Sequence, residues 1–285
     1  MSVVFFILAT GHTTNQLSKN KNILSKKQLP NVGKTAKKHR GIVNGLTIFG
    51  VHIILYIIYA KYGEVFMEAY KVIEIKKSVF ESNDREAEKL RAELKAEKTF
   101  LVNLMSSPGS GKTTTLRGTI GRLQQEMRIG VMEADIDSDV DAKTIAETGV
   151  RAIQLHTGGM CHLDAGMTRQ GVENLGTADL DLVFLENVGN LVCPAEFDTG
   201  AAKNMMILSV PEGDDKPLKY PLMFTVSDVV LINKMDTKSV FDFDDQAVQE
   251  RILKLNPQAK IFFISAKTGE GMDAVCDWLR QQVRD

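Results

Sequence analysis

The chain has 285 residues, of which 44% are hydrophobic and 25% are charged, and it contains three cysteines. This composition excludes collagen-like, wholly disordered and disulfide-scaffold proteins. Three cysteines in a chain of this length form no disulfide framework, which favours a reducing compartment and hence a cytoplasmic protein.

The formal net charge of −1 is the sum of two parts with opposite charge. Residues 1–66 contain nine Lys and Arg and one acid, Glu64, so this segment carries +8 and residues 67–285 carry −9. Such an asymmetry predicts that the first segment is a separate tail, anchor or targeting piece. The acidic remainder argues against extensive nucleic-acid binding, which needs a basic face to displace phosphate counterions.

A hydrophobic segment lies inside this basic part. Residues 42–60 carry no formal charge and number nineteen, which is just enough to cross a bilayer. Either Met67 is the native start and residues 1–66 are upstream sequence that was included when the gene's start was assigned, or these residues form a membrane anchor or targeting piece. Eight basic residues precede the segment, and they would hold the N-terminus in the cytosol and export the acidic part.

From Met67 onward the pattern becomes regular. Residues 67–98 are predicted to be an N-terminal helical region, because residues 81–98 are rich in Glu, Lys, Ala, Arg and Leu. Leu90 and Leu94 lie at helical spacing within it.

After residue 98, short apolar runs alternate with stretches of helical pattern. The predicted strands are Phe100–Met105, 129–133, 152–155, 182–186, 205–210, 229–233 and 261–264. The predicted helices lie near 112–127, 139–148, 163–175, 244–254 and 271–283. Near-continuous apolar strands separated by helices indicate an α/β domain over residues 99–285, with a mostly parallel sheet covered by helices on both faces.

The first strand runs directly into the sequence S-S-P-G-S-G-K-T and then into a helix, which is the context of a phosphate-binding loop. Lys112 supplies a charge for the β and γ phosphates, and the Thr113 hydroxyl can ligate Mg²⁺. Ser106 stands where the general pattern has its first glycine. The residues predicted to contact nucleotide are Gly109, Ser110, Gly111, Lys112, Thr113 and Thr114.

Two later strand ends predict which base is bound. Strand 229–233 ends in N-K-M-D, which includes Asn233, Lys234 and Asp236. An Asp carboxylate here accepts hydrogen bonds from guanine N1–H and from the exocyclic amine, a donor pair that adenine lacks. The last strand is followed by S-A-K, Ser265 to Lys267 with Ala266 between them, as in the guanine-binding loops of GTPases. The three motifs together predict a P-loop GTPase.

Carboxylates at strand ends beside the phosphate loop are candidates for holding Mg²⁺. Glu133 and Asp135 end the second predicted strand, and Glu186 ends the fourth. We expect Asp135 and Glu186 to act in the Mg²⁺ region and in catalysis, together with Lys112 and Thr113. Three further acids, Asp137, Asp139 and Asp141, follow at spacings of two, and a helix start explains them better than a calcium loop does.

A second metal constellation consists of Cys161, His162 and Cys193. Two thiolates and an imidazole suit Zn²⁺ or Ni²⁺ and leave an open coordination position. On spacing alone an alternative stays open, because lone cysteines are usually small buried hydrophobic residues. Cys276, beside Trp278 in the last predicted helix, is interpreted as a core residue.

The motifs together resemble the HypB family of GTPases, which assist nickel insertion into [NiFe]-hydrogenase. The resemblance covers about residues 70–285 and rests on S-S-P-G-S-G-K-T-T, D-I-D-S-D-V-D-A, T-G-G-M-C-H-L-D-A, E-N-V-G-N-L-V-C-P and N-K-M-D. It implies a dimerising P-loop GTPase fold similar to signal-recognition GTPases. It also implies that Cys161, His162 and Cys193 bind nickel or zinc near the dimer interface.

The resemblance further implies the partners: a homodimer that depends on nucleotide, a HypA-like nickel metallochaperone and the hydrogenase large-subunit precursor. The chain has no Cys before Cys161, and its five His form no tract, so we expect it to relay nickel from a partner and not to store it. Because Cys193 follows Glu186 by seven residues, metal binding is hypothesised to depend on the nucleotide state.

Three other functions are considered. A urease-type nickel GTPase such as UreG has a proline between the Cys and His of its metal motif, whereas Cys161 and His162 are adjacent here. A non-enzymatic metal-binding scaffold would use nucleotide only structurally. A membrane-tethered signalling GTPase would rely on residues 42–60, but the topology predicted from the basic residues would separate the acidic part from cytosolic GTP.

Overall fold

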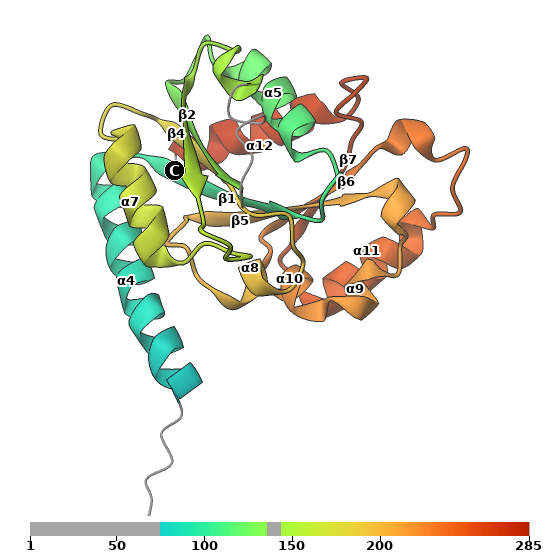
Figure 1. Cartoon of the computed structure of the whole chain (residues 1–285). Coiled ribbons are helices and arrows are strands. Elements are labelled where there is room, and N and C mark those ends of the chain that lie inside the picture. The colour runs from blue at the N-terminus through green and yellow to red at the C-terminus, as the bar shows by residue number, and fades with distance from the viewer. Residues whose placement is uncertain (1–74, 136–143, 285) are drawn as a thin grey trace, which may run out of the picture. The chain divides into compact units, whose positions relative to one another are not determined.

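A parallel sheet occupies the centre of the protein (Figure 1). The computed structural model describes residues 75–135 and 144–284. Within these residues the sheet has seven strands in the order β3-β2-β4-β1-β5-β6-β7, and every pairing is parallel. The strands are β1 (Phe100–Ser106), β2 (Ile129–Asp135), β3 (Arg151–His156), β4 (Leu182–Glu186), β5 (Lys203–Ser209), β6 (Val229–Asn233) and β7 (Lys260–Phe263).

Helices cover both faces of the sheet (Figure 1). The helices α5 (Lys112–Leu123) and α12 (Met272–Arg284) pack on one face. On the other face lie α4 (Ile75–Glu97), α7 (Ala165–Leu175), α10 (Pro221–Val226) and α11 (Asp245–Leu255). The described residues also include the short helical turns α8 (Cys193–Glu196), η2 (Val210–Glu212), α9 (Lys216–Lys219) and η3 (Met235–Thr237).

The two-sided core follows from the alternation of side chains along each strand. In β1, Leu104 belongs to the cluster under α5 and α12, whereas Met105 and Leu101 belong to the clusters on the opposite face. Each fully buried side chain of this size contributes about 1.5–3 kcal/mol to folding. Because β1 lies between β4 and β5, the loop that follows it emerges at the middle of the sheet's carboxyl edge.

The structure confirms all seven predicted strands, each with a shift of two residues or fewer at either end. The predicted helices at 112–127, 163–175, 244–254 and 271–283 are also confirmed. Of the predicted helix 139–148, residues 144–146 are helical, and 136–143 lie outside the described residues. The turns α8, α9 and α10 were not predicted, because four to six residues that start at or next to a proline give no periodic signal.

The predicted N-terminal helix is longer than the pattern 81–98 suggested. It begins by Ile75 and ends at Glu97, and Leu90 and Leu94 pack against Leu101 of β1 and Val183 of β4. The division of the chain at residues 66 and 98 stays a prediction. The hydrophobic segment 42–60 and the rest of the basic part lie outside the described residues.

No helix within residues 75–135 and 144–284 is both long and apolar enough to cross a membrane.

The turn between β7 and α12 generates a test of the fold. Gly271 has a left-handed φ of 72°, and a Cβ there would lie 2.2 Å from the backbone oxygen of Phe263. We expect Gly271→Ala to lower the free energy of unfolding by about 2 kcal/mol or more, because both backbone strain and a clash oppose it. The measurement is urea unfolding followed by circular dichroism.

Gly121 provides the matched control. It lies inside α5, and a Cβ there meets nothing within 4 Å. Gly121→Ala should therefore raise the free energy of unfolding by about 0.5–1 kcal/mol, since alanine favours the helix. Equal effects of the two substitutions would contradict the described turn.

Candidate functional site

A pocket of about 620 Å³ lies at the carboxyl edge of the sheet, beside the loop between β1 and α5. Its lining combines the phosphate-loop motif with the ends of β2, β3 and β4 and with the start of the segment after β6. The lining residues are Pro108, Gly109, Gly111, Lys112, Thr113, Thr114, Glu133, Ala134, Gln154, Glu186, Asn187, Val188, Gly189 and Lys234.

The loop has the backbone geometry that its sequence predicts. Gly109 and Gly111 have φ angles of 75° and 102°, a region that favours glycine. Gly111 is also the N-cap of α5, and a Cβ at this position would come within 2.5 Å of the Asn233 amide nitrogen. The helix N-terminus therefore faces the pocket with its backbone N–H groups, which favours an anion such as a phosphate.

Ser106, which replaces the first glycine of the general motif, forms the centre of a small hydrogen-bond network. Its Oγ accepts hydrogen bonds from Ser110 Oγ at 2.7 Å and from Lys112 Nζ at 3.0 Å, and it donates to the Ser107 carbonyl at 2.8 Å. The side chain is fully buried. The departure from the motif thus adds a hydroxyl that holds the loop and its lysine in place.

Carboxylates line the pocket opposite the loop. Lys112 Nζ lies 4.0 Å from Glu186 Oε1, and both side chains are shielded from solvent. The strand register places Glu133 beside Glu186 on one side and beside Gln154 on the other. A buried Lys–Glu pair next to a second buried acid is an environment that a bound divalent cation would stabilise, since its charge offsets that of the carboxylates.

The structure describes the backbone of one predicted acid, Asp135, and does not describe three others. Asp135 is the last residue of β2 and is in register with His156 of β3. Asp137, Asp139 and Asp141 lie outside the described residues. The assignment of Asp135 to the Mg²⁺ region therefore stays a prediction.

The predicted guanine-binding residues hold the phosphate loop as well. The side-chain amide of Asn233 donates to the Ser110 carbonyl at 2.9 Å, and its oxygen accepts from the backbone N–H groups of Lys234 and Ala266 at 2.8 and 3.0 Å. Lys234 Nζ donates to the Gly109 carbonyl at 2.6 Å. One asparagine thus joins three segments that are far apart in sequence.

The remaining guanine-site candidates lie next to each other. Ser265 Oγ donates to Asp236 Oδ1 at 2.7 Å, which fixes the orientation of the exposed carboxylate. Lys267 follows on the exposed side of the same loop. The structure therefore brings the phosphate loop, N-K-M-D and S-A-K to one end of the sheet.

The second constellation also comes together in the structure. The ligand atoms of Cys161, His162 and Cys193 all lie within 4.8 Å of one another, and all three residues are partly buried. Cys161 Sγ is 4.0 Å from His162 Nδ1. Two sulfurs and one imidazole nitrogen at this spacing fit a thiophilic divalent ion such as Ni²⁺ or Zn²⁺ and leave a further coordination position open.

Local electrostatics affect the imidazole and the second thiol of this cluster in opposite ways. Burial lowers the pKa of His162, despite the opposing charges of Asp164 and Glu196, so the imidazole is neutral and can donate a lone pair. A hydrogen bond with Cys161 raises the pKa of Cys193, and burial and the charge of Cys161 raise it further. Cys193 therefore holds its proton more tightly, and a metal ion that binds there displaces that proton and offsets the charge of the thiolates.

Cys276 has a different environment. It lies in α12 with no exposed surface and belongs to the core cluster under α5 and α12. Burial raises its pKa to about 11. The prediction that Cys276 is a core residue is confirmed.

A side chain that the sequence analysis missed connects the pocket with the metal cluster. Asn187 follows Glu186 at the end of β4, and its Oδ1 accepts from the backbone N–H of Leu163, the residue after His162, at 3.3 Å. Its Nδ2 donates to Asn103 Oδ1 at 3.1 Å. The sequence gives only a weak signal for the role of Asn187, since it shows no more than a polar residue after a strand. Gln154, a polar residue within β3 that also lines the pocket, gives an equally weak signal.

The sequence is similar to a family model and to several named proteins. The family model described as "CobW/HypB/UreG, nucleotide-binding domain" matches residues 100–263. The hydrogenase maturation factor HypB of Azotobacter chroococcum is 46% identical over 212 residues, which cover 74% of this chain and 70% of that protein. The HypB of Escherichia coli K12 is 44% identical over 216 residues, with 76% and 74% covered.

A solved structure is also similar. The crystal structure of HypB from Helicobacter pylori in complex with nickel has a TM-score of 0.67 and 40% sequence identity, and the match covers 71% of this chain and 95% of that one.

Proposed function

The chain belongs to the CobW/HypB/UreG family and, within it, to the HypB hydrogenase maturation factors, and on this premise we propose that it hydrolyses GTP to assist nickel insertion into [NiFe]-hydrogenase. The observation that carries the proposal is the cluster of Cys161, His162 and Cys193, whose ligand atoms lie within 4.8 Å of one another. This cluster is linked through Asn187 to the pocket that the phosphate loop lines.

The proposed reaction is the attack of water on the γ-phosphate of GTP, which gives GDP and phosphate. The backbone N–H groups of Gly109 to Thr114 and the ammonium of Lys112 bind the phosphate oxygens and offset the charge of the transition state. Asp236, oriented by Ser265, accepts from guanine N1–H and from its exocyclic amine. The shared segment at Asn233 keeps the base and phosphate sites at a fixed separation.

We propose that Mg²⁺ accompanies the nucleotide. The Thr113 hydroxyl and the carboxylates of Asp135 and Glu186 are the residues that would hold it, directly or through water. When bound, the ion neutralises charge on the β and γ phosphates. Glu133 lies beside Glu186 and is a further acid of the same region.

Nickel is the proposed cargo of the second cluster, and Zn²⁺ is the competing ion for the same ligands. Thiolate and imidazole donors bind both ions, so the ligands alone do not select between them. The nickel complex of the Helicobacter pylori relative supports nickel.

The metal and nucleotide sites are proposed to be coupled. Cys193 follows Glu186 by seven residues, and Asn187 between them is bonded to the backbone beside His162. A shift of the β4 end on loss of the γ-phosphate would therefore move the ligands on both sides of the metal.

The proposed partners follow from the family and from the relatives' names. They are a second copy of the chain in a nucleotide-dependent homodimer, a HypA-like metallochaperone that supplies nickel, and the hydrogenase large-subunit precursor that receives it. The proposed compartment is the cytoplasm, because the reaction needs GTP and reduced thiols.

The first test concerns hydrolysis. We expect Lys112→Ala to reduce steady-state GTP turnover at least 100-fold, because the ammonium that stabilises the phosphate charge is lost. Phosphate release is the measurement. Lys254→Ala, on an exposed position of α11, is the matched control and should retain full turnover. Absence of turnover in the wild-type protein would favour the non-enzymatic scaffold.

The second test concerns the metal ligands. Cys193→Ser should weaken Ni²⁺ binding by at least tenfold and reduce the thiolate-to-nickel absorption, because one soft ligand is replaced by a hydroxyl. Competition with a chromophoric chelator measures the affinity. Cys276→Ala removes a thiol from the core and should leave the affinity unchanged. Unaltered binding by Cys193→Ser would rule out this cluster as the nickel site.

The third test concerns the coupling. We expect the Ni²⁺ affinity of the wild-type protein to differ at least fivefold between GDP and a non-hydrolysable GTP analogue, which is the usual lower range of allosteric coupling. Asn187→Ala should reduce this difference, because it removes the bond to Leu163. Identical affinities in the two nucleotide states would refute the coupling.

A further inference from the structure

An aromatic ring is stacked on the proposed metal ligand His162. The ring of Phe197 lies 3.9 Å from the imidazole, centroid to centroid, and the two planes differ by 14°. Phe197 in turn contacts Phe80 of the N-terminal helix α4, with their centroids 4.9 Å apart. Neither phenylalanine offers a metal ligand, so any effect on the metal must act through His162.

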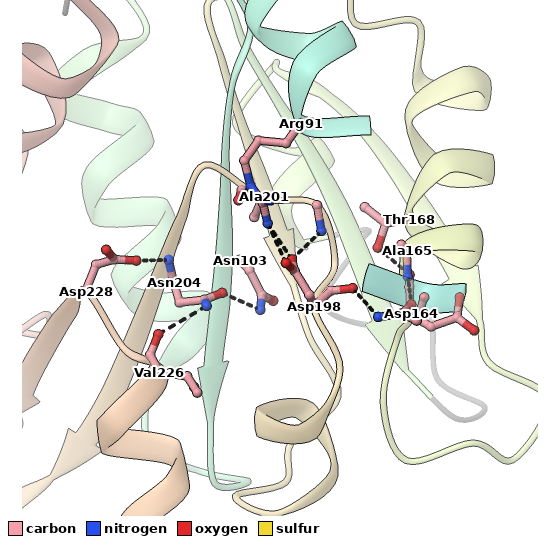
Figure 2. A network of polar contacts seen from close by, with 12 residues as sticks. Arg91, Asn103, Asp164, Ala165, Thr168, Asp198, Ala201, Asn204, Val226 and Asp228 are labelled. Atoms are coloured by element: carbon pink, nitrogen blue, oxygen red, sulfur yellow. Dashed lines mark hydrogen bonds and ion pairs between the residues drawn. The ribbon is translucent and has the colours of Figure 1, made fainter. Parts of the chain in front are cut away.

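The loop that carries Phe197 is fixed to α4 by polar contacts. Arg91 Nη2 donates to both carboxylate oxygens of Asp198, at 2.6 and 2.7 Å, and Arg91 Nε donates to the Ala201 carbonyl at 2.8 Å. Figure 2 shows Arg91 reaching from its helix to Asp198 and Ala201. The backbone directly after Phe197 is thereby held at several points.

The same helix holds the loop that carries His162. Asn83 Oδ1 accepts from the backbone N–H of Ala165 at 2.9 Å, and Asn83 Nδ2 donates to the Asp198 carbonyl at 2.9 Å. One side chain of α4 therefore bridges the first residue of α7, three positions after His162, and the loop of Phe197. Arg169 of α7 also pairs with Glu86 and Glu93 of α4, which fixes the two helices together.

We propose that Phe197 is a positioning residue for His162 and that α4, through Arg91 and Asn83, holds it there, so that the N-terminal helix sets the affinity of the metal cluster. The proposal rests on the metal site proposed above. An imidazole binds a metal through a lone pair in the plane of its ring. A flat ring stacked at 3.9 Å restricts rotation of that plane and keeps water from one face of the imidazole.

Helix α4 contributes by holding the loop that carries Phe197, so that the phenyl ring stays stacked on His162. Without the hydrogen bonds from Arg91 and Asn83, residues 197–201 would be held to α4 by nonpolar contacts alone, such as those of Phe197 with Phe80 and of Ala201 with the cluster that includes Leu90. Residues that orient a metal-binding histidine typically change metal affinity by ten- to one-hundred-fold when they are removed. We expect an effect of this size here.

The experiment compares Ni²⁺ binding by full-length variants, using chelator competition for affinity and the thiolate-to-nickel absorption band as the spectroscopic signature. Phe197→Ala and Arg91→Ala should each weaken binding by about ten- to one-hundred-fold and shift the band, with all three ligands present. Phe197→Tyr keeps the aromatic face and should restore both properties. If Phe197→Ala does not fold, Phe197→Leu removes the ring while it keeps a large apolar side chain.

Two controls separate local from general effects. Arg128→Ala breaks an ion pair with Asp181 outside the metal cluster and should leave Ni²⁺ binding unchanged. GDP affinity reports the integrity of the fold and should stay within about twofold of wild type in every variant.

The outcomes separate this proposal from the one on which it rests. If Cys193→Ser loses affinity while Phe197→Ala and Arg91→Ala bind Ni²⁺ as the wild type does, the positioning role is refuted and the metal site stands. If Cys193→Ser itself binds Ni²⁺ as the wild type does, the proposed metal site and the positioning role are both refuted.

Discussion

A parallel sheet brings the carboxyl ends of all its strands to one edge. The candidate residues of this protein lie at or after those carboxyl ends, so the direction of the strands places them together. The phosphate loop follows β1, the acids end β2 and β4, and N-K-M-D follows β6. The proposed metal ligands come from the segments that leave β3 and β4 at the same edge. Two sites that differ in chemistry are neighbours because the central strands β1, β4 and β2 are neighbours.

That edge concentrates buried polar groups, which are costly unless they are hydrogen-bonded. Asn103, Asn187 and Asn233 are almost completely buried, and each makes side-chain hydrogen bonds to a segment distant in sequence. Asn103 Nδ2 also donates to Asn204 Oδ1 of the neighbouring strand β5 at 3.0 Å, as Figure 2 shows. A satisfied network of this kind makes the relative position of the loops specific, since a shifted loop leaves a buried amide without its partner.

The sequence predicts what depends on local pattern. Apolar runs define the strands, and the glycines and Lys112 define the phosphate loop. The residue types of Cys161, His162 and Cys193 indicate a candidate metal site, although spacing alone leaves open that the cysteines are ordinary buried residues. What the sequence does not predict depends on contacts between distant segments. The bond of Asn187 to Leu163, the stack of Phe197 on His162 and the role of Ser106 each require the three-dimensional arrangement.

The sizes of the interactions limit how the two sites can communicate. A single hydrogen bond such as that from Leu163 to Asn187 is worth about 0.5–1.5 kcal/mol net, which corresponds to at most about tenfold in an equilibrium constant. Allosteric couplings typically reach about 1–3 kcal/mol. The Asn187 contact alone therefore accounts for the lower part of that range. A larger coupling requires the covalent segment from Glu186 to Cys193 to move as well, and the contacts of α4 with the Phe197 loop oppose such a movement. The size of the proposed nucleotide dependence of metal binding would then depend on how firmly the N-terminal helix holds that loop.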